Sequence, residues 1–230
     1  MTSRMTRIGG ALALVAGLAV SAAALAADDD HPSRRFEVTI TNLTRGQQFT
    51  PILVATHKES IKLFRLGAPA SPELATLAEE GNPVPLAATL RALPDAGQVV
   101  TGNGLTNPGA TTTLVVEGRG GFDHFSVAAM LIPTNDGFFA VNGVPLPRGS
   151  ETLTLTAPAY DAGSERNDEL CASIPGPFFP ECRGSGGGAR VGGGEGYVHI
   201  HAGIHGVGDF AAANRDWRNP VALITVRRMR

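Results

Sequence analysis

The chain has 230 residues, a formal net charge of -2 at pH 7 and a hydrophobic content of 43%. A mildly acidic chain lacks the basic patch that binds phosphate backbones, apart from the short end VRRMR, which we interpret as a solvated tail. We therefore expect no nucleic-acid partner. A chain of this length can bury one substantial core, and no internal repeat or long linker divides it, so we expect one folded domain.

The first residues have the pattern of an export signal. Arg4 and Arg7 give a positive start, residues 8–20 are apolar, and residues 24–26 form an A-x-A cleavage pattern. A permanent membrane anchor is the alternative, but the run is rich in Ala and Gly, is short for the hydrocarbon core and ends in small residues. The mature chain is then exported, to the periplasm or out of the cell, and has no membrane span. The expected divisions are a signal peptide at 1–26, a disordered segment at 27–35 and the folded domain at 36–230.

The first folded segment alternates in the way a half-buried strand does. Residues 36–43, FEVTITNL, place Phe36, Val38 and Ile40 on one face and polar residues on the other. We expect a strand here.

Residues 70–83, ASPELATLAEEGNP, carry the signals of a helix instead. Ser71 is a good N-cap, Pro72 suits the first helical position, and Gly81 is a C-terminal stop. The next segment, PLAATLRAL, predicts a second short helix. We expect both helices within a long connection between strands.

Six further short segments alternate or are rich in β-branched residues, with turn residues between them. They are TTTLVVEG, FDHFSVAAMLIP, GFFAVNG, ETLTLTA, GYVHIHA and NPVALITVRR. Seven strands of this kind predict an all-β fold, a sandwich or a barrel. FSVAAMLI is apolar on both faces and should lie centrally, whereas ETLTLTA should have one face in water.

Cys171 and Cys182 are the only cysteines of the chain. An even pair in an exported chain predicts a disulfide, which would close the proline-rich loop CASIPGPFFPEC, and the C-x-x-C spacing of an oxidoreductase is absent. The glycine-rich residues 183–196 follow. They offer few side chains to pack and no helix pattern follows them, so they predict a flexible surface loop and not a phosphate-binding one.

Three acidic residues stand at the ends of expected strands. Glu117 closes TTTLVVEG, Asp136 lies in the turn PTNDG, and Asp161 opens DAGSE. Carboxylates at one rim of a sandwich can converge on Ca²⁺, which takes roughly six to eight oxygen ligands. The alternative is that Asp136 and Asp161 are Asx-turn residues that make local hydrogen bonds.

Several longer segments occur together in a recognisable order, from about Phe36 to Arg228. They are FEVTITNLTRGQQFTPILVATH, MLIPTNDGFFAVNG, YDAGSE and HIHAGIHGVGDF…DWRNPVALITVRR. Together they resemble the spondin domain, in particular its exported bacterial form. The resemblance implies a calcium-binding, C2-like antiparallel β-sandwich of the kind that extracellular matrix proteins use for adhesion.

The resemblance also implies a ligand set. In animal members of the family the ion is held by a Glu on a strand, the Asp of a P-S-P-D-W turn and the Asp of a Y-D-A-G-T segment, which match Glu117, Asp136 and Asp161. Two positions depart from that pattern, because Gly137 replaces the Trp and Ser164 replaces the Thr. Neither departure removes a carboxylate.

The segment HIHAGIHG is missing from the animal members, so their calcium site does not explain it. His199 and His201 are two residues apart and leave the same face of a strand, and His205 follows a glycine at which the chain can turn back. With His57 from VATHKES and Asp209, these histidines could bind Cu²⁺ or Zn²⁺. The alternative is a strand whose polar face carries imidazoles that are hydrogen-bonded to their neighbours.

The sequence offers little for catalysis. No G-x-S-x-G elbow is present and both cysteines are expected to be paired, so we expect no enzyme, with a lyase or hydrolase built on Glu117 or the histidines as the alternative. We interpret the chain as an exported calcium-binding module that binds or adheres to an extracellular or cell-surface ligand. A periplasmic Cu²⁺ or Zn²⁺ protein that uses the histidines is the second interpretation.

Overall fold

The computed structural model describes residues 33–176, 179–184, 187–188 and 192–230. The expected signal peptide, most of the segment expected to be disordered and part of the glycine-rich segment lie outside the described residues. The first strand begins at Arg34, two residues before the expected start of the domain at Phe36.

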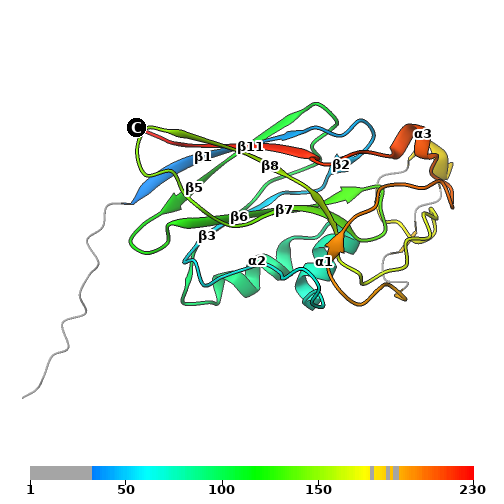
Figure 1. The fold of residues 1–230 in the computed structure, drawn as a ribbon, viewed down its shortest axis with the longest axis horizontal. Helices are drawn as coiled ribbons and strands as arrows, with labels where there is room; N and C mark the ends of the chain where they lie inside the picture. Colours follow the sequence, from blue (N-terminus) through cyan, green and yellow to red (C-terminus); the bar gives the residue numbers. More distant parts are fainter. Residues whose placement is uncertain (1–32, 177–178, 185–186, 189–191) are drawn as a thin grey trace, which may run out of the picture.

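Two antiparallel sheets face each other as a sandwich, which confirms the all-β prediction (Figure 1). The first sheet has the order β5-β1-β11-β8. Its strands are β1 (Arg34–Asn42), β5 (Thr111–Gly118), β8 (Thr152–Ala157) and β11 (Ala222–Arg228). The second sheet has the order β10-β9-β7-β6-β3-β4, and β2 also pairs with β6. Its strands are β2 (Gln48–Phe49), β3 (Leu53–His57), β4 (Ala96–Thr101), β6 (His124–Ile132), β7 (Gly137–Pro145), β9 (Ala159–Asp161) and β10 (His199–Ile200).

The core between the sheets follows from the alternation of the strands. On β1 the side chains of Phe36, Val38 and Ile40 point inward and are at most 2% exposed. On β7, Phe139 packs into the sandwich and Phe138 into a second apolar cluster on the other face of the sheet. The two predictions on burial are confirmed, because β6 lies inside its sheet and is buried almost throughout, whereas β8 is an edge strand with alternating exposure.

The second cluster exists because α1 (Pro72–Glu80) and α2 (Val84–Arg91) cover the outer face of the second sheet (Figure 1). The N–H of Leu74 donates to the Ser71 hydroxyl at 3.2 Å, and Gly81 ends α1 with a left-handed φ of 65°. Both helix predictions are confirmed. No helix in the described part of the chain is long and apolar enough to cross a membrane.

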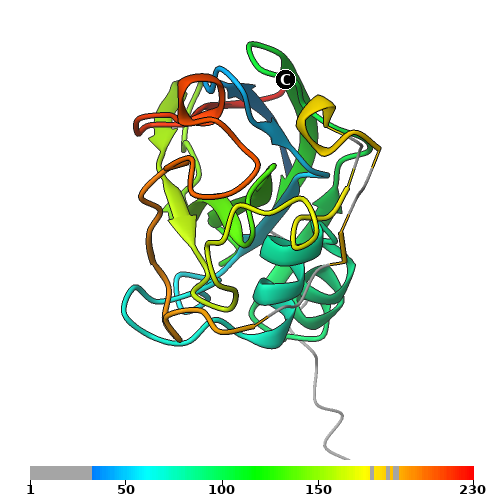
Figure 2. The ribbon, with the colours of Figure 1, turned by 90° about the vertical axis from the view of Figure 1, so that its right-hand side faces the viewer.

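The sandwich has two ends of different construction. The turn end, on the left of Figure 1, holds residues 33–35, 118–123, 145–150 and 228–230. The loop end, on the right, holds the turn at residues 133–136 and the long connections within residues 162–221, which include η1 (Pro180–Cys182) and α3 (Ala212–Arg215). These connections face the viewer in Figure 2. The predicted disulfide between Cys171 and Cys182 is confirmed and lies among them, with a Cα–Cα distance of 5.5 Å.

Candidate metal centre

Strand pairing brings an aspartate and a histidine together at the loop end. Gly137, the first residue of β7, is the register partner of Asp161 on β9, and Asp161 is the register partner of His199 on β10. Register partners point to the same face of a sheet, so Asp161 and His199 lie side by side. Asp136 directly precedes Gly137 in the turn between β6 and β7.

Glu195 completes a group of possible metal ligands. One ligand atom from each of Asp161, Glu195 and His199 lies within 4.8 Å of the other two. The Nε2 atom of His199 is 3.7 Å from Asp161 Oδ1 and 3.4 Å from Glu195 Oε2. The three side chains therefore surround a space of the size that one cation takes.

The ring of His199 is oriented as a metal ligand requires. Its Nδ1 atom is 3.1 Å from the carbonyl oxygen of Ile200, which can only accept, so Nδ1 carries the hydrogen and the neutral ring has its lone pair on Nε2. That Nε2 atom is buried and has no hydrogen bond among the described residues. Burial lowers the pKa of His199, but the Ile200 carbonyl and the carboxylates of Asp161 and Glu195 outweigh it, and the net shift is upward.

Asp136 is fully buried, and its two carboxylate oxygens have different surroundings. Oδ2 accepts from the backbone N–H groups of Ser164 and Glu165, at 2.7 and 2.9 Å, and from the Ser164 hydroxyl at 3.1 Å. Oδ1 is buried without a donor among the described residues. Burial and the charge of Asp161 raise the pKa of Asp136 to about 7, against the opposing effect of the three donors. A cation near Oδ1 would offset the cost of burying this charge.

Asp161 is held by its own loop. Oδ1 accepts from the N–H of Gly163, two residues on, and Oδ2 accepts from the side-chain amide of Asn167, both at 2.7 Å. The Asx-turn interpretation is thus confirmed for Asp161. It is wrong for Asp136, whose donors are 28 and 29 residues away in the chain. Both carboxylates are fixed in place, as the ligands of a preorganised metal site are.

His201 is 6% exposed, and its ring is oriented differently from that of His199. The N–H of Gly203 donates to Nδ1 at 2.9 Å, so the neutral ring carries its hydrogen on Nε2, which is buried without an acceptor in the described part of the chain. Burial lowers the pKa of His201, which keeps the ring neutral. Trp217 packs against it with ring centroids 4.9 Å apart. His201 therefore presents a hydrogen-bond donor to the site.

Gly137 makes room for that imidazole. A Cβ atom at Gly137 would lie 2.8 Å from Cδ2 and 3.1 Å from Nε2 of His201, and 2.7 Å from the hydroxyl of Thr134. Carbon atoms do not approach neighbours so closely without displacing them. The imidazole of His201 therefore depends on the absence of a side chain at position 137.

The three-carboxylate site expected from the resemblance is not formed, because Glu117 lies at the turn end. The next residue, Gly118, packs against Leu146, which follows the last residue of β7, whereas Asp136 precedes the first. Eight residue steps along β7 put Glu117 about 25 Å from the aspartate pair. Its carboxylate is exposed and accepts from the Ser33 hydroxyl at 3.1 Å. Of the predicted carboxylates, the fold brings together Asp136 and Asp161.

The proposed histidine set is also only partly assembled. His57 is buried near the turn end with both ring nitrogens engaged, Nδ1 with the Lys58 carbonyl at 2.7 Å and Nε2 with the Ser126 hydroxyl at 2.8 Å. His205 is exposed and is not part of the ligand group, although its backbone N–H donates to Glu169 at 2.5 Å. The carboxylate of Asp209 accepts from the Cys171 N–H at 2.8 Å. The inclusion of His57 was wrong, because both of its ring nitrogens are engaged near the turn end. The inclusion of His205 and Asp209 stays a prediction.

Glu195 was missed by the sequence analysis. It lies in the glycine-rich segment that we expected to be a flexible loop, and nothing in its immediate surroundings suggests a site. The available signal was its position four residues before His199, as the one acidic residue of that segment.

A family model described as Spondin_N matches residues 30–168, more than half of the chain. The matched region includes Asp136 and Asp161 but ends before Glu195, His199 and His201. The comparison with curated proteins found no match. With the antiparallel sandwich and the predicted motifs in their expected order, this match shows that the chain belongs to the Spondin_N family.

Proposed function

We propose that this chain is an exported module that binds one divalent metal ion at the loop end, and that the ion is zinc. The observation that carries the proposal is a set of three buried polar atoms without a hydrogen bond among the described residues. They are Asp136 Oδ1, His199 Nε2 and His201 Nε2. Buried polar atoms are nearly always satisfied, so several unpaired ones near a cluster of carboxylates indicate a ligand that satisfies them.

The residues divide into ligands and supporting groups. Asp161, Glu195 and His199 are the proposed ligands, because their ligand atoms already lie within 4.8 Å of one another. Asp136 adds negative charge on the buried side, and the Nε2–H of His201 is a donor for a ligand carboxylate or for water on the ion. Zinc sites commonly combine a few side chains with water in this way.

The imidazole favours zinc over calcium. Zinc accepts nitrogen and carboxylate ligands, whereas calcium takes roughly six to eight oxygens. With Glu117 at the other end of the sandwich, calcium would lack one carboxylate that the resemblance implies. Copper shares the preference of zinc for imidazole and is the second candidate, favoured by the same orientation of His199.

The test uses the mature chain without a histidine tag, stripped of metal and titrated with zinc, copper or calcium by calorimetry. Zinc at 100 times its dissociation constant should add about 2.7 kcal/mol to the free energy of unfolding, because it binds the folded state alone. His199→Gln should abolish this gain. His124→Gln is the matched control, since His124 also contacts a carboxylate, that of Asp123 at 2.8 Å, but at the turn end.

The outcomes separate the candidate ions. Calcium binding that survives His199→Gln, with no response to zinc, would assign the site to calcium and its carboxylates. A response to copper that greatly exceeds the response to zinc would assign it to copper. No stabilisation by any of the three ions would refute a metal site at the loop end.

We also propose that the module acts by binding an extracellular or cell-surface partner and not by catalysis. Membership in the family indicates an extracellular module, and a disulfide agrees with export. Both cysteines are bonded to each other, so neither is available as a nucleophile. Fractionation of cells that express the full chain, with the protein traced in the periplasm and the medium, distinguishes the two destinations.

A further inference from the structure

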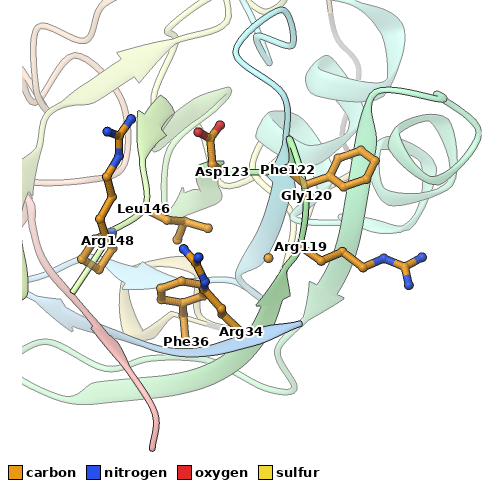
Figure 3. Close-up of a pocket in the computed structure, with 10 residues that line it drawn as sticks. Arg34, Phe36, Arg119, Gly120, Phe122, Asp123, Leu146 and Arg148 are labelled. Atoms are coloured by element: carbon orange, nitrogen blue, oxygen red, sulfur yellow. The ribbon is translucent and has the colours of Figure 1, made fainter. Parts of the chain in front are cut away.

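A hollow of about 360 Å³ lies at the turn end, remote from the metal centre (Figure 3). Its floor is apolar, because Phe36 is 2% and Leu146 is 6% exposed, and Phe122 forms part of the wall. The floor is also closely packed, since a Cβ atom on Gly118 would lie 2.9 Å from Leu146 and 3.3 Å from Phe36. The volume is in the range of sites that hold small molecules.

Three arginines line this hollow: Arg34, Arg119 and Arg148. All three are exposed, and none of them has a carboxylate partner among the described residues. In Figure 3 the side chain of Arg34 extends over the floor toward Leu146, whereas that of Arg119 points away from Phe36 and Leu146. They come from three separate segments, the start of β1, the turn after β5 and the turn after β7.

Several other arginines of the described chain have a carboxylate partner, which Arg34, Arg119 and Arg148 do not have. The Nε atom of Arg227 is 2.7 Å from the carboxylate of Glu37, and that of Arg215 is 2.8 Å from the carboxylate of Glu181. The one acidic residue in the lining, Asp123, is already bonded to the Nδ1 of His124 at 2.8 Å. The hollow therefore has an excess of positive charge above an apolar floor.

We propose that this hollow binds a small organic carboxylate. The carboxylate group pairs with the arginines, and the apolar part of the molecule, such as an aromatic ring, packs on the floor. The planar guanidinium of arginine pairs with both oxygens of a carboxylate, and it keeps its charge at every relevant pH. Phe36, Phe122 and Leu146 give the apolar body a surface from which water is released. An inorganic anion would use the arginines alone, and a neutral ring the floor alone.

The experiment is a titration of the isotope-labelled mature chain with benzoate, followed by two-dimensional NMR, with benzamide as the neutral analogue and phosphate as the inorganic one. Benzoate should shift the amide signals of Gly118, Gly120 and Leu146 in a saturable way. Benzamide and phosphate should each bind at least about tenfold more weakly, because each lacks one of the two contacts. Signals at the loop end should not move.

Variants test the arginines. Arg34→Gln and Arg148→Gln should each weaken benzoate binding about tenfold, because each removes a charge-assisted hydrogen bond. Arg228→Gln is the matched control, since it removes the same charge from the same end without belonging to the lining. A two-dimensional NMR spectrum of each variant that matches the spectrum of the unsubstituted protein away from the hollow verifies that the variant is folded.

Any one of the following results would overturn the proposal. The first is equal binding of benzamide, which would show that the charge is not recognised. The second is equal binding of phosphate, which would reduce the site to a simple anion site. The third is a loss of affinity in Arg228→Gln as large as in Arg148→Gln, or no saturable shift with benzoate at millimolar concentration.

Discussion

The loop end and the turn end of the sandwich differ in the burial of their charged side chains. At the loop end Asp136 and Asp161 are buried and held by N–H groups of the connection that follows β9, so their charges are part of the folded structure. At the turn end Arg34 and Arg148 are exposed and have no carboxylate partner in the described chain. A buried charge has to be matched by fixed partners, whereas an exposed one is matched by water. Substitutions at the loop end should therefore change stability, and those at the turn end should change binding only.

The largest effect on stability is expected for Asp136→Ala. The substitution leaves the N–H groups of Ser164 and Glu165 buried without an acceptor, and each such group costs about 1 to 3 kcal/mol. Removal of a buried charge recovers part of this cost. We expect a loss of about 3 kcal/mol in the free energy of unfolding, measured by urea denaturation in the presence of a chelator.

Glu117→Gln is the counterpart at the turn end. Its carboxylate is exposed and accepts one hydrogen bond, from Ser33, so the change in the free energy of unfolding should stay within about 0.5 kcal/mol. The zinc response should also be unchanged, because Glu117 is remote from the loop end. A loss of stability in Glu117→Gln equal to that in Asp136→Ala would contradict the contrast between the two ends.

The disulfide is a further difference between the two ends, because it joins connections of the loop end and has no equivalent at the turn end. Replacement of both Cys171 and Cys182 by Ser should lower the free energy of unfolding by about 2 kcal/mol, as expected when a loop of this length is opened in the unfolded chain. Zinc affinity should fall as well, while benzoate binding at the turn end should not. Equal losses at both sites would show that the ends are not independent.

The sequence predicted the fold well because its signals are local. Alternation on β1 and the capping residues Ser71 and Gly81 each specify one element without reference to the rest of the chain. The two burial states of β6 and β8 were also readable from their side-chain patterns.

The site was predicted only in part because it depends on which strand ends meet. Glu117 lies at the end of β5, and Asp136 directly precedes the start of β7. Nothing in the sequence says that these two strand ends lie on opposite sides of the sandwich. The pairing of β9 with β10, which joins Asp161 to His199, links segments 38 residues apart through a two-residue strand. The contact between Gly137 and His201 joins residues far apart in the chain, and no local pattern encodes it.

The pH dependence of the metal-free protein tests the buried aspartate pair. The pKa of Asp136 is raised to about 7 in the folded state, above the ordinary aspartate value of 3.8, so the folded state binds the proton more tightly than the unfolded state does. The contribution of this group to stability should therefore fall as the pH rises from about 4 to 7, by at most about 1.4 kcal/mol per pH unit. Urea denaturation in chelator at pH 5, 6 and 7 measures this slope, and Asp136→Asn should reduce it. A slope unaffected by Asp136→Asn would assign the pH dependence to other groups. Zinc should bind more weakly as the pH falls, because the raised pKa of His199 favours a proton on the imidazole that would hold the ion.

A smaller loss of stability than in Asp136→Ala is expected for Gly137→Ala, which tests whether His201 needs the space that this glycine leaves. The new methyl group would meet Cδ2 of His201 at 2.8 Å and the Thr134 hydroxyl at 2.7 Å, so the imidazole has to move. We expect a loss of about 1 kcal/mol in stability from the forced shift and a fall of about tenfold in zinc affinity, because the Nε2–H donor leaves its position. Gly149→Ala is the matched control at the turn end, where a Cβ atom would meet nothing within 4 Å and neither quantity should change. Zinc affinity that is unchanged in Gly137→Ala but lost in His199→Gln would show that His201 does not support the ion, and would leave Asp161, Glu195 and His199 as the complete site.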